Sequence, residues 1–152
     1  MPLLIDALNV AYWCGAPPGL RLPLAVLAGA LAAGHGAELV FDASAPYQLR
    51  DDAEVWSRLL AGDWPVTVVP SGHSADAVLL RMARDRGGCI VSNDRFRDHR
   101  RRFRRLIDDP VRLQRGVVRN DCIELPGLGL NWPLPASAPL ALAALDRQRL
   151  PL

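Results

Sequence analysis

Five aspartates could act together, because each stands at the end of an apolar run or near the start of a helical pattern. They are Asp6, Asp42, Asp76, Asp94 and Asp98. If the apolar runs are parallel strands, these carboxylates meet at one edge of the sheet. Clustered carboxylates raise one another's pKa unless a cation lies among them, and oxygen ligands favour Mg²⁺ or Mn²⁺. A metal held in this way can orient a water for attack on a phosphodiester.

Each of these aspartates also has a purely structural interpretation. Asp76 and Asp94 near helix starts would interact favourably with the helix dipole. Asp98 can pair with arginines three and four residues further on, and Asp42 can cap its own turn. Asp6 is the hardest to explain in this way, because an aspartate that ends a buried strand costs free energy without a partner. The functional interpretation depends on the convergence of the group.

Arginine is the second chemical feature of the sequence. All 18 basic residues are arginines, and ten of them lie between Arg95 and Arg119, so the net charge of +2 conceals one strongly basic face. Such a face favours a polyanionic partner, and phosphate contacts would position a nucleic acid on it. A solvated helix face is the alternative, with Phe96 and Phe103 as its core-facing side. The arginines that we expect to contact this nucleic acid are Arg95, Arg97, Arg100, Arg101, Arg102 and Arg105.

Several other classes of site lack their signatures. The chain has no GxGxxG, no phosphate-binding GxxxxGK[ST] and no GxSxG motif. Its three cysteines are far apart and form no CxxC pair, which argues against a disulfide framework and a zinc-cysteine site. No targeting segment or uninterrupted membrane-spanning run is visible. We therefore expect a cytoplasmic protein with no membrane partner.

Short apolar runs that alternate with helical stripes must position these side chains. We expect strands at 3–5, 39–41, 66–69, 89–91 and 117–123, and helices over 20–34, 51–62 and 74–87, with a basic helix over 95–106. This alternation is typical of an α/β protein with a parallel sheet of about five strands and helices on both faces. With 152 residues, we expect one compact domain over 1–126. A Pro-rich extension over 127–152 should pack on it and end in a short helix near 140–149.

Four blocks of the sequence resemble regnase-type ribonucleases, which belong to the NYN branch of the PIN-like nucleases. Residues 4–11 (LIDALNVA) resemble the start of that domain, and residues 90–98 (IVSNDRFRD) resemble its VSND block. Residues 74–80 are similar to its central acidic helix, and residues 119–126 to the strand that ends it. The resemblance covers about residues 1–126, and the first and third blocks along the chain are the specific ones.

The resemblance implies a PIN-like Rossmannoid three-layer fold and a Mg²⁺- or Mn²⁺-dependent endoribonuclease. It gives metal-site and catalytic roles to four of the aspartates and places Asn9 as a hydrogen-bonding residue beside Asp6. The metal ligands implied are Asp6, Asp76, Asp94 and Asp98, and further candidate site residues are Asp42, Ser92 and Asn93. The sequence departs from the family pattern at Ala7, where a glycine is usual, and at Ala75, where several relatives have a second acid. The second departure favours one metal ion over two.

Other functions stay open from the sequence alone. The chain could be an RNA-binding module without catalysis or a PIN-type toxin ribonuclease with an antitoxin encoded next to it. It could also be an assembly protein that docks a protein partner through the Pro-rich tail, which includes Trp132. Homodimer formation is a further alternative that the sequence does not decide.

Overall fold

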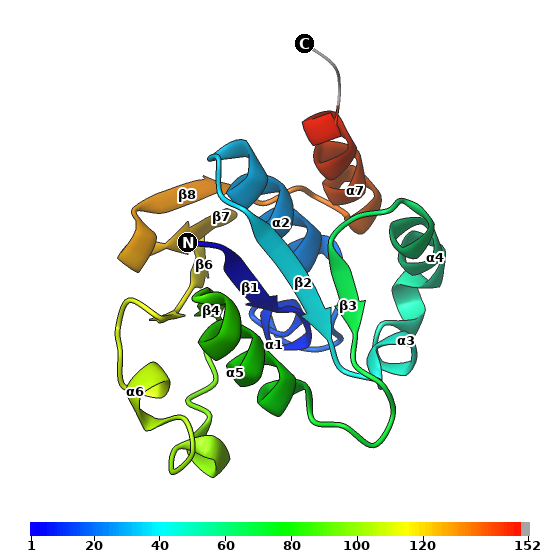
Figure 1. The fold of residues 1–152 in the computed structure, drawn as a ribbon. Coiled ribbons are helices and arrows are strands. Elements are labelled where there is room, and N and C mark those ends of the chain that lie inside the picture. The colour runs from blue at the N-terminus through cyan, green and yellow to red at the C-terminus, as the bar shows by residue number, and fades with distance from the viewer. Residues whose placement is uncertain (150–152) are drawn as a thin grey trace.

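A parallel sheet of five strands lies at the centre of the computed structural model, which describes residues 1–149 (Figure 1). Its order is β3-β2-β1-β4-β5. The strands are β1 (Leu3–Asp6), β2 (Ala37–Phe41), β3 (Val66–Val68), β4 (Cys89–Val91) and β5 (Leu113–Gln114). This architecture confirms the predicted α/β class with a five-stranded parallel sheet and helices on both faces.

Apolar side chains point alternately to the two faces of the sheet and so build two cores. Leu3 and Ile5 of β1 belong to one core, whereas Leu4 between them belongs to the other. Val40 shares the second core with Leu4. Because successive strand residues face opposite sides, a strand covered on both faces must be apolar throughout. This requirement explains the short continuous apolar runs in the sequence.

Helices cover both faces of the sheet. The first core is covered by α1 (Ala7–Ala11), α2 (Arg21–Ala32) and α4 (Ala53–Ala61), and the second by α5 (Ala75–Arg86). The predicted signals of α5 are present, because the Ser74 side chain accepts a hydrogen bond from the Ala77 N–H at the helix start. Gly87 ends the helix with a φ of 74°, a conformation that glycine adopts without strain. Two short segments, α3 (Ala45–Gln48) and η1 (Arg50–Asp52), precede α4.

The prediction of a fifth strand over residues 117–123 is wrong. These residues form a hairpin of β6 (Val117–Arg119) and β7 (Cys122–Leu125), which belongs to a separate antiparallel sheet of order β6-β7-β8. Asn120 and Asp121 both have positive φ angles, of 50° and 58°. Two such residues in succession make the tight turn that joins antiparallel strands. The fifth parallel strand is instead the short β5.

The prediction of one basic helix over residues 95–106 is also wrong. Only η2 (Arg97–His99) and α6 (Arg104–Ile107) are helical in this stretch. Phe96 has a φ of 52°, which no right-handed helix contains, and arginines three and four residues apart repel one another on a helix. Phe96 and Phe103 are buried in the second core, as expected. The segment therefore folds around two aromatic anchors rather than as a helix.

The last part of the described chain packs against the first core. It comprises η3 (Pro126–Leu128), β8 (Leu130–Pro133), α7 (Ala138–Asp146) and η4 (Arg147–Arg149). α7 lies beside α2, and Figure 1 shows this pair at the side of the sheet away from α5 and α6. No helix among residues 1–149 is long and apolar enough to cross a membrane.

Candidate active site

Three neighbouring strands deliver aspartates to the same end of the central sheet. Asp6 is the last residue of β1, Asp42 follows β2, and Asp94 lies three residues after β4. Since β2, β1 and β4 are adjacent and parallel, their carboxyl ends meet at one edge. Asp76, in the first turn of α5, is brought to that edge from the helix above it.

A hollow of about 280 Å³ joins these four aspartates, and we call it the carboxylate pocket. Its polar lining consists of Asp6, Asn9, Asp42, Ser74, Asp76 and Asp94. A neighbouring hollow of about 480 Å³ shares Asp76 and Asp94 with the first. Asp98, which is exposed, lines the second hollow together with Asn93, Arg95, Arg97 and His99. The structure thus places four of the predicted aspartates around one hollow and sets Asp98 in the neighbouring one.

Asp6 is the most constrained of the group. The residue is 6% exposed, and its Oδ2 accepts a hydrogen bond of 2.8 Å from Ser92 Oγ. Burial raises its pKa to about 7, and the charges of Asp76 and Asp94 add to the rise. The Ser92 hydroxyl and the Asn9 backbone oppose it. Asp6 is therefore a carboxyl group whose charge the fold alone does not stabilise.

Asp76 is the second aspartate with a raised pKa. Desolvation is the largest cause, followed by the charge of Asp94, while His99 lowers the pKa. Asp42 and Asp98 contribute smaller increases. All five candidate aspartates are thus linked electrostatically to this edge of the sheet.

The loop after β4 connects Asp94 to Asp6 through Ser92. Ser92 is fully buried, and its Oγ accepts from the Asp94 N–H at 3.0 Å while it donates to Asp6. Asp94 Oδ1 in turn accepts from the Phe96 N–H at 2.8 Å. The second contact differs from the helix-dipole interaction considered from the sequence, because Asp94 is followed by non-helical residues and η2 begins only at Arg97. Asp94 therefore combines a structural contact with a place in the carboxylate pocket.

Asn9 and Asn93 hold the loop in position from the other side. Asn9 Oδ1 accepts hydrogen bonds from Trp13 Nε1 at 3.0 Å and from the Asn93 N–H at 2.9 Å. The Asn93 side chain makes two hydrogen bonds with the backbone of Gly116. Because the Asn9 oxygen already serves two donors, Asn9 organises the site rather than offering a free oxygen ligand. The sequence contained no signal for the Trp13 and Gly116 contacts.

Asp42 caps its own turn, as the sequence suggested, and further side chains that the sequence did not indicate extend this contact. Its Oδ2 accepts from both the N–H and the Oγ of Ser44, at 2.9 and 2.6 Å. Gln48 Nε2 donates to Ser44 Oγ, and Tyr12 OH donates to Gln48 Oε1. The aspartate-x-serine spacing is typical of a capped turn and indicates the Ser44 contact. Gln48 and Tyr12 carry no such signal, because only the fold brings them together.

The predicted RNA-binding arginines divide between two places. Arg95 and Arg97 line the hollow next to the carboxylate pocket, whereas Arg101, Arg102 and Arg105 line a different hollow. Arg100 pairs with Asp108 at 3.1 Å. Within residues 1–149, none of the other five makes an ion pair with an acid. They remain able to bind a phosphate.

The residues of the carboxylate pocket suit a hydrated divalent cation. Among residues 1–149, no three His, Cys, Asp or Glu side chains converge closely enough to hold an ion by themselves. Mg²⁺ does not require this, because it commonly keeps several waters and binds through one or two carboxylates. The pKa values of Asp6 and Asp76 are raised mainly by desolvation and by neighbouring aspartates, and a bound cation would favour the charged form of both carboxylates. An all-oxygen donor set of this kind fits Mg²⁺ or Mn²⁺.

Comparison with known proteins identifies a family to which this sequence is similar. The sequence model of one family, described as the Zc3h12a-like ribonuclease NYN domain, matches residues 1–124. A search of the curated proteins finds no match. The matched range contains every strand of the parallel sheet and all five candidate aspartates.

Proposed function

The chain belongs to the Zc3h12a-like NYN ribonuclease family, and on this premise we propose that it cleaves RNA with a divalent metal ion held at the carboxylate pocket. Membership supports ribonuclease activity and an RNA substrate in general. The observation that carries the metal-dependent proposal is the shared pocket of Asp6, Asp76 and Asp94, in which two pKa values are raised.

The proposal assigns different tasks to the residues of this pocket. Asp6 and Asp94 would hold the ion, because Ser92 fixes both of them through its hydroxyl group. When bound, Mg²⁺ or Mn²⁺ supplies an oriented water and stabilises the charge that develops on the phosphate. Asp76 would accept the proton of the attacking water, since a raised pKa brings a carboxylate closer to the range in which a general base is effective. Arg95 and Arg97, beside the pocket, would bind phosphates of the strand.

Incubation with a mixed RNA pool tests the proposal directly. We expect cleavage by the full chain in Mn²⁺, no cleavage in EDTA, and none by Asp76→Asn in Mn²⁺. Asp51→Asn, at an exposed position on η1, is the matched control and should cleave like the parent. Absence of metal-dependent cleavage at micromolar protein would contradict the proposal.

A catalytically weak RNA-binding module is the second candidate. It is favoured by the lack of three converging ligand side chains among residues 1–149 and by the exposed arginines of the 95–105 segment. It predicts RNA binding in EDTA that Mn²⁺ does not convert into cleavage. The same incubation therefore separates the two candidates.

A further inference from the structure

A separate hollow of about 480 Å³ lies between the C-terminal half of α5 and the segment around α6, and we call it the arginine pocket. Its apolar lining is Phe103 and Leu106, and Asp109 is its one lining acid. The basic side chains that line it are Arg84, Arg101, Arg102, Arg104, Arg105 and Arg112. None of the five candidate aspartates lines this hollow.

We infer that the arginine pocket binds a phosphate-bearing nucleotide unit of the RNA strand, outside the bond that is cleaved. This inference rests on the proposed function, because it extends the substrate path away from the carboxylate pocket. It adds Arg84 and Arg112, which lie outside the predicted RNA-binding segment, to the residues that contact RNA.

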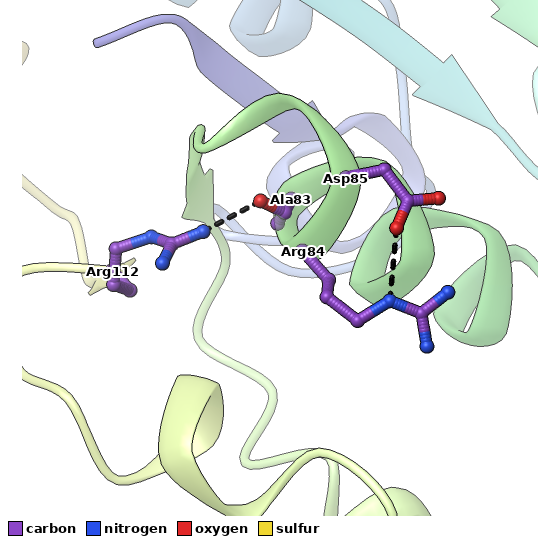
Figure 2. Close-up of polar contacts among 4 residues, drawn as sticks. All are labelled: Ala83, Arg84, Asp85 and Arg112. Atoms are coloured by element: carbon purple, nitrogen blue, oxygen red, sulfur yellow. Dashed lines mark hydrogen bonds and ion pairs between the residues drawn. The ribbon is translucent and has the colours of Figure 1, made fainter.

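Arg112 and Arg84 already make polar contacts within the protein (Figure 2). Arg112 donates from Nη2 to the Ala83 carbonyl at 2.5 Å and from Nε to the Gly88 carbonyl at 2.9 Å. These contacts cover carbonyl oxygens at the end of α5, where the helix dipole is negative. Arg84 pairs through Nε with Asp85 Oδ1 at 2.9 Å, so that its two terminal nitrogens remain available. A guanidinium group with free terminal nitrogens matches two phosphate oxygens.

The ring of Phe103 lies near two of the arginines that line the pocket. The Arg84 guanidinium carbon lies 5.5 Å from the centre of the Phe103 ring, and that of Arg102 lies 6.0 Å from it. Cations at this distance are attracted to the ring face. Because Phe103 is 5% exposed and belongs to the second core, its ring offers both arginines a contact at a fixed place. Two of the arginines that line the pocket thus contact the same core residue.

The positive charge of the arginine pocket favours an anion that carries more than one negative charge. Arg104 lies 3.7 Å from Asp108, and Asp109 accepts a hydrogen bond from the Val111 N–H. In the described part of the chain, Arg101, Arg102 and Arg105 pair with no acid. Like charges gathered in one hollow repel, and successive phosphates of a strand would relieve this repulsion. A volume of this order also lies in the range of pockets that bind small organic groups.

Continuity with the candidate active site favours an RNA strand over a free nucleotide. Arg95 and Arg97 line the hollow that shares Asp76 and Asp94 with the carboxylate pocket, and Arg101 to Arg105 line the arginine pocket. One stretch of chain therefore contributes to both places. A strand bound along this segment would reach from the carboxylates to the arginine pocket.

Binding in EDTA tests the inference independently of cleavage. We would measure the affinity of fluorescently labelled RNAs of 4 and 12 nucleotides for the full chain, and that of adenosine 3′,5′-bisphosphate by competition. The variants are Arg84→Gln and Arg102→Gln, with Arg58→Gln on the exposed face of α4 as the matched control. We expect each pocket variant to weaken 12-nucleotide binding at least fivefold and 4-nucleotide binding less. Each should also reduce the slope of log affinity against log salt concentration by about 0.7, the value for one lost phosphate contact on a single strand.

The possible results test the arginine pocket and the proposed function independently. Unchanged 12-nucleotide affinity in both pocket variants would overturn the inference, and a loss confined to the bisphosphate would overturn it by assigning the pocket to free nucleotides. An equal loss in Arg58→Gln would show a general charge effect and would overturn it too. Failure of the parent to cleave RNA in Mn²⁺ would contradict the proposed function alone, because the binding measurements contain no metal.

Discussion

Burial of Asp6 at the end of β1 places a carboxyl group where its charged form is unfavourable, and its pKa rises to about 7. The ordinary value of an aspartate is about 4. The folded protein therefore binds this proton more tightly than the unfolded chain does. By linkage, the contribution of protonated Asp6 to the free energy of unfolding is fully present below about pH 4. It is lost as the pH rises through 7. A cation in the carboxylate pocket would remove this cost.

Asp6→Asn should reveal that cost in the metal-free protein. The amide oxygen can still accept the Ser92 hydrogen bond, but the side chain no longer ionises. In EDTA, we expect the variant to match the parent at pH 4 and to exceed it by on the order of 2 kcal/mol at pH 8, measured by urea unfolding. The exposed Asp51→Asn serves as control and should show no such trend. A gain of the same size at both pH values would refute the explanation.

Asp94 allows its structural and functional roles to be separated by two substitutions. Asp94→Asn keeps an oxygen for the Phe96 N–H, whereas Asp94→Ala removes it and should cost about 1 kcal/mol. We expect Asp94→Asn to abolish cleavage while leaving the stability in EDTA unchanged or about 1 kcal/mol higher, because repulsion is relieved. Mn²⁺ should raise the melting temperature of the parent more than that of Asp94→Asn.

A purely structural Asp94 would behave differently. In that case both substitutions would destabilise the EDTA-treated protein by similar amounts, and Mn²⁺ would shift neither variant nor parent. Thermal melts in EDTA and in Mn²⁺ measure both quantities on the same samples.

At the level of elements, the β6–β7 hairpin depends on a turn in which two residues that are not glycine have positive φ. Asp121, at a φ of 58°, should tolerate glycine well, because glycine adopts this region without strain. We expect Asp121→Gly to leave the protein equally stable or to stabilise it by about 0.5 kcal/mol. Asp121→Val should destabilise it by about 1–2 kcal/mol, because a β-branched side chain clashes with the backbone there. Chemical denaturation of the two variants checks this, and equal stabilities would contradict it.

The same hairpin shows where sequence patterns fail. Helix α5 could be predicted because Ser74 and Gly87 mark its ends by local chemistry. The Asn120-Asp121 turn could not be recognised as easily, because neither residue is a glycine and the flanking apolar residues suggested one continuous strand. The prediction of a helix over the basic segment, residues 95–106, was wrong for another reason. Burial of Phe96 and Phe103 overrides the helical preference of arginine, and this burial exists only in the folded chain.

The placement of the aspartates could be predicted from the sequence more readily than the helices and strands around them. Strand ends place Asp6 and Asp42 at one edge, since parallel strands share direction, and this required no knowledge of side-chain contacts. The Tyr12–Gln48–Ser44 chain behind Asp42 could not be predicted, because 36 positions separate Tyr12 from Gln48. Likewise, the arginine pocket depends on Arg84 of α5 and on Arg112, which precedes β5 and reaches α5 only in the folded chain, where it donates to the Ala83 carbonyl.

For the whole molecule, the described residues beyond the nuclease-like sheet are part of the hydrophobic core. Ala141, Leu142 and Leu145 of α7 are buried in the same core as α2, and Trp132 occupies the space beside Gly29. Burying several such side chains contributes an amount comparable to the total stability of a small domain. Removal of residues 127–152 would therefore be expected to compromise folding, and it is an unsuitable test of a docking role for this extension.

Point substitutions on α7 test both roles cleanly, because one helix carries a buried and an exposed leucine. Leu142 is 3% exposed and Leu140 is 55% exposed. If the extension is a structural part of the domain, Leu142→Ala should destabilise by about 2–4 kcal/mol and Leu140→Ala by less than about 0.5 kcal/mol. Urea unfolding measures both. If α7 instead docks a partner or a second copy, Leu140→Glu should change the size-exclusion volume of the full chain or abolish partner binding while stability stays the same. The structural role predicts that Leu140→Glu leaves the elution volume unchanged and that only Leu142→Ala lowers the free energy of unfolding, since the buried side chain loses its contacts with α2.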